Sequence, residues 1–201
     1  KAFSTDVGVE VASLGVQVHG GMGYIEETGA AQHYRDARIA AIYEGTNGIQ
    51  AIDLVTRKLP LAGGEPLRAY HAELKEVAAS VQAINDPAFG ATARRLEESI
   101  SCLERASAWL LDRLGMEPEA ALAGASPYLR LFAYAAGGCA LAEEALAAKT
   151  MREARAADPE PFVALARFFA ENVSVQAQGL ERMVIDGAPS VSASALDASA
   201  A

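Results

Sequence analysis

The stretch Pro66–Ile84, PLRAYHAELKEVAASVQAI, decides the fold class of this 201-residue chain. Its larger apolar residues recur at intervals of three and four positions: Leu67, Tyr70, Leu74, Val77, Val81 and Ile84. That spacing is typical of one face of an α-helix and not of a β-strand. Pro66 suits a first helical position, because the N–H that it lacks would have no partner there. The stretch therefore predicts a long amphipathic helix with one face in a core.

Three further helix starts with the same chemistry follow downstream. A capping side chain precedes a proline at Asp86–Pro87, Ser126–Pro127 and Asp158–Pro159. Helical apolar spacing continues behind each start, with Leu96, Ile100, Leu103, Leu110 and Leu114, then Leu129, Phe132, Cys139 and Leu146, then Phe162, Leu165, Phe169, Val173, Leu180 and Val184. Helices joined by short connections pack as antiparallel neighbours. Residues 66–186 are predicted to form an up-and-down bundle of about four helices.

The residues before this bundle also predict helices, so the expected fold class is all-α. Residues 1–18 carry Phe3, Val7, Val11, Leu14 and Val18 on one predicted face. Further helices are expected over 34–41 and 49–59, and Pro60–Pro66 is rich in Pro and Gly, as linkers are. We expect domains at 1–62 and 66–186 and a disordered, Ser- and Ala-rich tail at 187–201. The helical pattern is already under way at Lys1, which suggests a piece of a longer polypeptide.

Composition excludes several functional classes. The net charge is −9, with 12 basic and 19 acidic side chains after residue 64, which disfavours nucleic acid and anionic membranes as partners. No apolar run is expected to reach the ~20 residues of a membrane span. Cys102 and Cys139 lie in apolar helical runs without metal-ligand spacing, so we predict buried free thiols and no metal site. Free thiols fit a reducing compartment, so we predict a cytoplasmic location. The three histidines are scattered and predict neither a triad nor a metal site.

The stretch Ile42–Gln50, IYEGTNGIQ, contains the strongest candidates for catalytic and cofactor-binding residues. It sets the carboxylate of Glu44 among two glycines and a threonine at the start of an apolar helix. Glu44 could act as a general base on a weakly acidic proton; its charge could equally serve only the helix start. Thr46 and Gly48 could hold an anion or phosphate with helix-terminal amides, although capping by Thr46 explains the pattern as well.

About 25 residues upstream, Gln17–Tyr24 reads QVHGGMGY. Gln17, Gly20 and Gly21 could present an amide side chain and bare backbone to a nucleotide. A pair of glycines is also a common way to end a helix. Residues alone leave both interpretations open.

Three motifs in fixed order resemble those of flavin-dependent acyl-CoA dehydrogenases. They are Gln-x-x-Gly-Gly-x-Gly-Tyr at 17–24, Tyr-Arg-Asp-Ala-Arg-Ile at 34–39 and Ile-Tyr-Glu-Gly-Thr at 42–46. The resemblance covers residues 1–59 and corresponds to the end of the family's C-terminal helical domain. Residues 66–186 resemble, more weakly, the extra helical domain of some bacterial members, including those acting on methylthio-propanoyl-CoA.

The resemblance implies α,β-dehydrogenation of an acyl-CoA thioester to the trans-2-enoyl-CoA. Glu44 would take the pro-R α-proton, while the β-hydrogen leaves as hydride to flavin N5. The backbone N–H of Glu44 and a flavin ribityl hydroxyl would polarise the thioester carbonyl. Gly45 would line the substrate site, and Thr46 and Gly48 would touch the FAD of the same subunit.

The resemblance also implies partners. Gln17, Gly20 and Gly21 would reach the FAD of a neighbouring subunit, which implies a homodimer or homotetramer, with electron transfer flavoprotein as the usual electron acceptor. Two positions depart from the family pattern, since Gly48 replaces a frequent Gln and His19 an aromatic or apolar residue. The N-terminal helical domain and β-domain of the family are not in this sequence, so we expect the isolated chain to be inactive.

Two other functions stay open. An acyl-CoA oxidase would share the fold and the base, and would consume oxygen without an added electron carrier. A non-catalytic oligomerisation or docking module would use residues 66–186 for subunit contacts. Glu44 disfavours nitroalkane oxidases of this superfamily, whose base is Asp, and the acidic bundle disfavours the DNA-associated flavoproteins of the superfamily.

Overall fold

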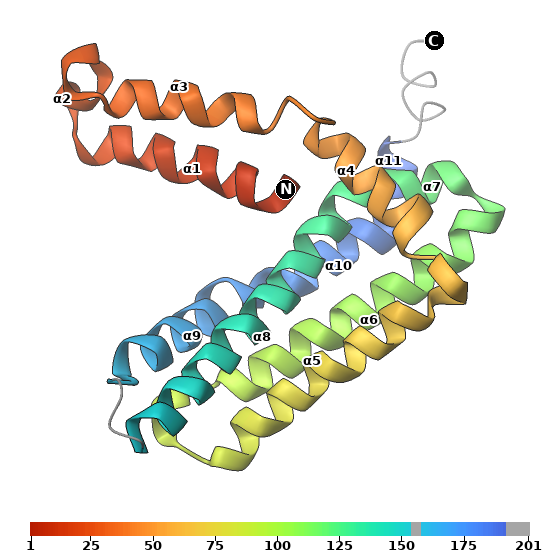
Figure 1. The fold of residues 1–201 in the computed structure, drawn as a ribbon. Helices are drawn as coiled ribbons and strands as arrows, with labels where there is room; N and C mark the ends of the chain where they lie inside the picture. The colour runs from red at the N-terminus through yellow and green to blue at the C-terminus, as the bar shows by residue number, and fades with distance from the viewer. Residues whose placement is uncertain (154–157, 192–201) are drawn as a thin grey trace, which may run out of the picture. The chain divides into compact units, whose positions relative to one another are not determined.

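The computed structural model describes residues 1–153 and 158–191, with side chains described for residues 1–150 and 158–191. These ranges are helical throughout, apart from turns, and contain no strand (Figure 1). The predicted all-α class is therefore confirmed. The chain divides into two compact units, residues 1–54 and 55–201, and each is described by itself.

The first unit contains four helices. They are α1 (Ala2–Val18), the single turn α2 (Gly21–Tyr24), α3 (Ala30–Ala40) and α4 (Asn47–Asp53). A 3₁₀ turn at Glu26–Thr28 leads into α3, which packs antiparallel against α1 (Figure 1). Its fully buried residues are all small: Ala2, Gly23, Ala30, Ala41 and Ala51. The first unit thus has little apolar core of its own.

The apolar face that the sequence predicts for residues 1–18 is packed in its first half only. Phe3 and Val7 are partly buried, whereas Val11, Leu14 and Val18 are 59%, 57% and 85% exposed. The helix was predicted correctly, and its packed face in part.

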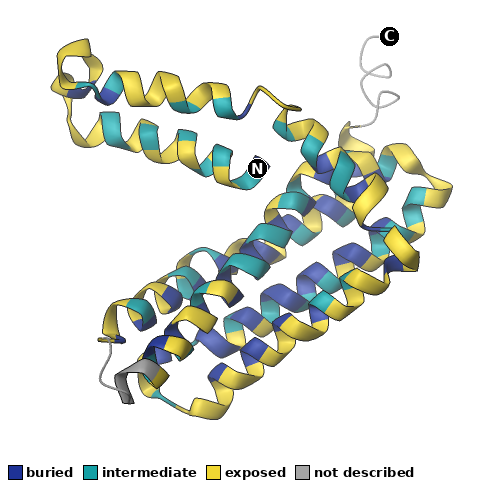
Figure 2. Cartoon of the chain, viewed as in Figure 1, coloured by how far each residue is buried: buried dark blue, intermediate teal, exposed yellow. Residues whose placement is uncertain are grey.

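The second unit is a helical bundle. Its long helices are α5 (Glu65–Ile84), α6 (Thr92–Met116) and α8 (Ala125–Glu153), and the fourth segment consists of α9 (Glu160–Asn172) and α10 (Ala177–Asp186). Neighbouring segments run side by side, and their buried faces meet in one continuous core (Figures 1 and 2). The core contains Leu96, Ile100, Leu103 and Leu110 of α6 with Tyr128 and Leu131 of α8, all 0% exposed. The predicted bundle is confirmed.

Some polar groups inside this core have hydrogen-bond partners, whereas Ser174 Oγ and His71 Nε2 are buried without one among the described residues. The Tyr128 hydroxyl lies 2.8 Å from Ser107 Oγ, which donates to Leu103 O at 2.6 Å. Cys102 and Cys139 are free and buried as predicted, and burial raises the pKa of each thiol to about 12. Both thiols are therefore protonated at neutral pH and chemically inert.

Helix starts and breaks differ in detail from the predictions. Pro87 begins only a 3₁₀ turn (Pro87–Phe89), because Gly90 at φ 54° separates this turn from α6. Helix α8 begins at Ala125, so Ser126 lies inside its first turn and not before it. A short helix that the sequence did not predict, α7 (Pro118–Ala123), joins α6 to α8.

The predicted fourth helix is divided in two. A 3₁₀ turn at Ser174–Gln176 separates α9 from α10, where Asn, Val and Ser follow one another and each has low helix propensity. The buried face of α9 also differs, since Val163, Ala166 and Ala170 are buried and Leu165 is 49% exposed. Alanines on α9 allow close packing against α8, and they were missed because only large apolar residues were counted.

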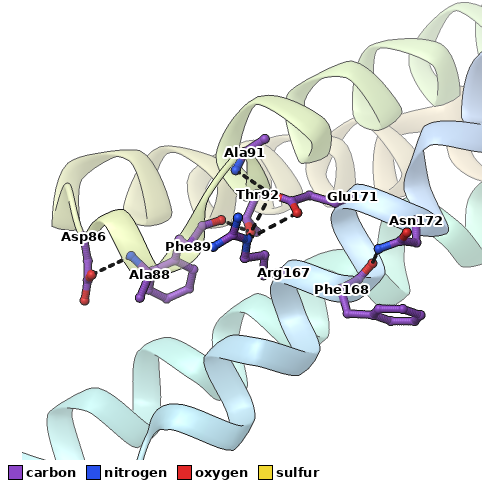
Figure 3. A network of polar contacts seen from close by, with 9 residues as sticks. All are labelled: Asp86, Ala88, Phe89, Ala91, Thr92, Arg167, Phe168, Glu171 and Asn172. Carbon is purple, nitrogen blue, oxygen red and sulfur yellow. Dashed lines mark hydrogen bonds and ion pairs between the residues drawn. The ribbon is translucent and has the colours of Figure 1, made fainter.

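A charged contact closes the bundle where α6 begins (Figure 3). Glu171 Oε1 accepts a hydrogen bond from the backbone N–H of Ala91 at 3.0 Å and another from Arg167 Nε at 3.1 Å. The carboxylate satisfies a helix-terminal donor and complements the helix dipole. Asp86 accepts from the Ala88 N–H at 2.9 Å, as its predicted capping role requires, and also pairs with Lys149.

Two boundary predictions need comment. The compact units divide between residues 54 and 55, before the Pro60–Pro66 linker, and Val55 and Leu59 are both buried. The tail expected to be disordered from 187 begins instead with a short helix, α11 (Ala188–Val191), whose Ala188 is buried. Residues 192–201 lie outside the described residues.

One helix is long and apolar enough to cross a membrane. Residues Ala125–Thr150 of α8 have a mean hydropathy of 1.2 over the relevant window, although the longest uncharged run in this helix, residues 131–142, is shorter than the ~20 residues of a membrane span. Tyr128, Leu131, Ala135, Cys139 and Ala142 of this helix are all buried inside the bundle. A core helix can have the same length and composition as a membrane span, and 44% of the window is buried in the bundle.

Candidate functional site at the turn before α4

The candidate site is the turn that joins α3 to α4, over residues 41–46. Backbone bonds fold it tightly: Ile42 N and Tyr43 N both donate to Ile39 O, at 2.9 and 3.2 Å, and Asn47 N donates to Ala41 O at 3.2 Å. Thr46 caps α4, since its Oγ1 accepts from Ile49 N at 3.5 Å. The turn therefore places Glu44 at its tip.

Glu44 has an unusual backbone conformation. Its φ is 54°, in the left-handed region that side chains other than Gly, Asn and Asp rarely adopt. Gly45 follows with φ 84°, and a Cβ there would lie 3.0 Å from Gln50 Nε2, so glycine is required at position 45. Strain of this kind costs about 1–3 kcal/mol per residue and concentrates at functional sites.

The tip of the turn presents a carboxylate together with free backbone donors. The Glu44 side chain is exposed within this unit. The backbone N–H groups of Glu44, Gly45 and Thr46 donate to no acceptor in the described part of the chain. An anion or a polarised carbonyl oxygen could accept from such amides while the carboxylate takes a nearby proton.

Side chains from α1 and α4 hold this turn. Gln50 Nε2 donates to Glu44 O at 3.2 Å, and Lys1 Nζ donates to Gly45 O at 3.0 Å. Asn47 connects the turn to the first turn of α1 through Ala2, Thr5 and Asp6. Sequence reasoning missed Lys1 and Asn47, because no local spacing links residue 1 with residues more than 40 positions later. It also missed Gln50, although this residue lies only six positions from Glu44.

The predicted cofactor residues near the turn remain open to a ligand. A Cβ built on Gly48 meets nothing within 4 Å, and the Thr46 hydroxyl uses only its acceptor in the cap, so its proton can still be donated. These two residues fit a polar cofactor group approaching the start of α4.

The upstream motif lies at the far end of the same hairpin. Gln17 is exposed near the end of α1, and Gly20 and Gly21 follow in the turn to α2, with open space where a Cβ would stand. Gly20 has φ 60°, which favours glycine. The third glycine of the motif, Gly23, has a structural role instead: its Cβ would lie 2.2 Å from Val16 O.

The structure does not bring the two predicted sets together within one chain. Asn47 binds the first turn of α1, whereas Gly20 follows the last. The 17 residues of α1 span about 25 Å at 1.5 Å per residue. Glu44, Gly45, Thr46 and Gly48 form one group and Gln17, Gly20 and Gly21 another.

The three histidines lie apart from the turn and from one another in the sequence. His19 and His33 are exposed and His71 is buried in the bundle. Within residues 1–150 and 158–191, no group of three His, Cys, Asp or Glu side chains could hold a metal ion. Arg35 of the second motif pairs with Glu26 at 3.4 Å on the surface of the hairpin.

Comparison with protein families accounts for both units. Residues 1–59 match the family model "Acyl-CoA dehydrogenase, C-terminal domain", and residues 72–195 match "Acetyl-CoA dehydrogenase C-terminal like". The chain belongs to the acyl-CoA dehydrogenase family. The two matches adjoin in the same order as the two structural units, and the first contains the strained turn.

Individual relatives agree with this membership. Over 196 residues the chain is 42% identical to the 3-methylmercaptopropionyl-CoA dehydrogenase of Ruegeria pomeroyi, covering 92% of this chain and 32% of that protein. It is 33% identical over 113 residues to a butyryl-CoA dehydrogenase of Syntrophomonas wolfei, covering 54% and 18%. The human mitochondrial short-chain specific acyl-CoA dehydrogenase is 38% identical over 72 residues, covering 36% and 16%. The chain thus spans about a third of the first relative's length and less of the others'.

Proposed function

We propose that this chain supplies the catalytic base of an FAD-dependent acyl-CoA dehydrogenase, which converts an acyl-CoA thioester to the trans-2-enoyl-CoA. The observation that carries the proposal is the strained turn at Glu44. A left-handed glutamate with free N–H groups beside it has no evident value for folding. It does have value for presenting a carboxylate and amide donors together.

The residues of this chain would share the chemistry as follows. The carboxylate of Glu44 accepts the α-proton of the thioester. The Glu44 N–H donates to the thioester carbonyl oxygen, where negative charge develops as the proton leaves. Gly45 lines the substrate site without a side chain to obstruct it. FAD, when bound, accepts the β-hydrogen as hydride.

The positions of the other motif residues support a site shared between subunits. Thr46 and Gly48 would contact the FAD of their own subunit, and Gln17, Gly20 and Gly21 the FAD of a neighbour. The length of α1 between these groups favours this interpretation, because one compact cofactor group cannot touch both ends. A site shared in this way requires a homodimer or homotetramer. We also propose electron transfer flavoprotein as the electron acceptor and the cytoplasm as the location.

The test uses a complete flavoprotein that carries this chain. A panel of acyl-CoAs is supplied with a dye acceptor, and the product is expected to be lighter by two hydrogens in mass spectrometry. Glu44→Gln should keep FAD and acyl-CoA binding and lose about 10²–10⁴-fold or more in turnover. Near-normal turnover in that variant would remove Glu44 from the role.

Two alternatives have distinct outcomes in simple assays. Oxygen consumption and peroxide release without an added acceptor would identify an acyl-CoA oxidase. If the bundle is instead an oligomerisation module, a flavoprotein truncated after Leu59 should contain fewer subunits by light scattering, and an unchanged number of subunits would refute that role. The isolated 201-residue chain is expected to be colourless and inactive, and a stoichiometric flavin spectrum would contradict this.

A further inference from the structure

Side chains hold the strained turn at Glu44 in addition to its backbone hydrogen bonds. Glu44 O accepts from Gln50 Nε2 at 3.2 Å, and Gly45 O accepts from Lys1 Nζ at 3.0 Å. Glu44 and Gly45 are the two consecutive residues with positive φ in the turn. The carbonyl oxygen of Glu44 is thus bound by a side chain of α4, and that of Gly45 by the side chain of Lys1, which directly precedes α1.

Asn47 is the centre of this arrangement. Its Nδ2 lies 3.1 Å from Ala2 O, 2.9 Å from Thr5 Oγ1 and 2.6 Å from Asp6 Oδ1. Its Oδ1 accepts from Lys1 Nζ at 2.8 Å and from Thr5 Oγ1 at 3.2 Å. All of these partners belong to the first turn of α1 or directly precede it.

The backbone of Asn47 makes the second connection. Its N–H donates to Ala41 O at the end of α3, at 3.2 Å. One residue therefore bonds to the start of α1 and to the end of α3, and the turn lies between these attachments. Lys1, oriented by Asn47 Oδ1, extends the same network to the carbonyl of Gly45.

From this geometry we infer that Asn47 is a positioning residue for Glu44, acting together with Lys1 and Gln50. The inference rests on the proposed function, because it assigns Asn47 to the reaction only through Glu44. Rotation about the Glu44 backbone moves its carboxylate and its N–H together. Loss of the network lets the turn relax from the left-handed conformation and misdirects both groups at once.

The burial pattern separates this role from a role in folding. Lys1 and Asp6 are exposed and Asn47 is only partly buried, so the network covers little apolar surface. Surface polar contacts contribute little to global stability. A misplacement of about 1 Å, in contrast, costs on the order of 10²-fold in rate.

The decisive variant is Asn47→Ala in a complete flavoprotein that carries this chain. We expect kcat to fall about 10–100-fold while KM, FAD content and the thermal midpoint change little. Hydrogen–deuterium exchange should rise in peptides covering residues 41–47 and stay unchanged in residues 30–40. Glu10→Gln, an exposed change on α1 outside the network, is the matched control and should match the wild type.

A reciprocal exchange provides the rescue. In Asn47→Asp combined with Asp6→Asn, the amide and the carboxylate change places, so the contact between positions 6 and 47 can re-form with its donor reversed. The bond from position 47 to Ala2 O cannot re-form, because a carboxylate only accepts, so the double variant should recover part of the lost kcat and of the lost exchange protection, and Asn47→Asp alone should recover neither. A gain in kcat at an unchanged thermal midpoint separates positioning from an effect on folding.

The outcomes distinguish the inference from the proposed function. If Glu44→Gln abolishes turnover while Asn47→Ala leaves kcat and exchange unchanged, the positioning role is refuted and the base survives. If Glu44→Gln retains turnover, the proposed function fails first. Loss of FAD or a large fall in melting temperature in Asn47→Ala, without rescue by the exchange, would show a structural role and refute the inference.

Discussion

The two units of this chain differ in what holds them together. The bundle buries large side chains completely, among them Leu96, Ile100, Leu103 and Tyr128. The hairpin unit buries only alanines and one glycine, and leaves Val11, Leu14 and Val18 exposed. Apolar burial is the main source of folding free energy, so the bundle is stabilised by packing and the turn at Glu44 by directed hydrogen bonds. The strained, chemically equipped residue lies in the unit with the smaller core.

The largest expected difference between the two units is the loss of stability when the same substitution, Leu to Ala, is made in each. Leu103→Ala empties a fully buried site in α6 and should lower the free energy of unfolding by about 2–5 kcal/mol. Leu14→Ala, at a side chain 57% exposed in α1, should cost no more than about 0.5 kcal/mol. Urea denaturation of the 201-residue chain, followed by circular dichroism, measures both. Equal losses would show that the two units do not differ in packing.

A second test concerns the glycine before α6. In Gly90→Ala the new Cβ would lie 2.5 Å from Arg167 Nε and from Glu171 Oε1, at a backbone φ of 54°. The free energy of unfolding of this variant should fall by about 1–3 kcal/mol. The hydrogen bond between the Ala91 N–H and Glu171, drawn in Figure 3, should weaken. Gly115→Ala is the matched control, because residue 115 lies in α6 and a Cβ there would meet nothing within 4 Å. The free energy of unfolding of this variant should be unchanged or higher by up to about 1 kcal/mol. The same urea titration compares them.

A third test measures the strain at the candidate base. Glycine adopts the left-handed conformation of Glu44 without penalty, whereas alanine does not. Glu44→Gly should therefore be more stable than Glu44→Ala by about 1–2 kcal/mol, although both lack the carboxylate. Calorimetric unfolding of the flavoprotein measures the difference. An alanine variant as stable as the glycine variant would mean that the turn relaxes freely and that position 44 bears no strain.

The smallest expected effect is a pH dependence in the bundle. Burial lowers the pKa of His71, with Glu104 opposing the shift and Lys75 adding to it. The unfolded chain therefore binds a proton near pH 6.5 that the folded bundle binds only at lower pH, so stability falls as the pH drops below 6.5. Urea midpoints measured between pH 7.5 and 5 should decline less in His71→Leu than in the wild type. His33→Gln, at an exposed histidine, should follow the wild type, and identical slopes in all three would exclude His71 as the cause.

Much of the fold could be predicted from sequence, because helical periodicity and capping residues act locally. The Pro66 and Asp158 helix starts and the core face with Leu96, Ile100 and Leu103 followed from spacing alone. Packing faces rich in alanine could not be predicted this way, as α9 shows, because alanine is compatible with surface and core alike.

The candidate site was only partly predictable. Local motifs identified Glu44 and its neighbours as unusual, and the left-handed backbone of Glu44 gives that prediction a physical basis. The contacts that Lys1 makes with Gly45 and Asn47 join parts of the chain that are distant in sequence. A single sequence contains no spacing that reports such contacts, so they required coordinates.

The rate of flavin reduction in Glu44→Gln tests the central claim most directly. Acyl-CoA is mixed anaerobically with the complete flavoprotein, and the loss of flavin absorbance is followed in a single turnover, which separates chemistry from product release. The account predicts an unchanged flavin spectrum before mixing and a rate constant lower by about 10²–10⁴-fold or more. Flavin reduction at the wild-type rate would contradict it, because another group would then be removing the α-proton.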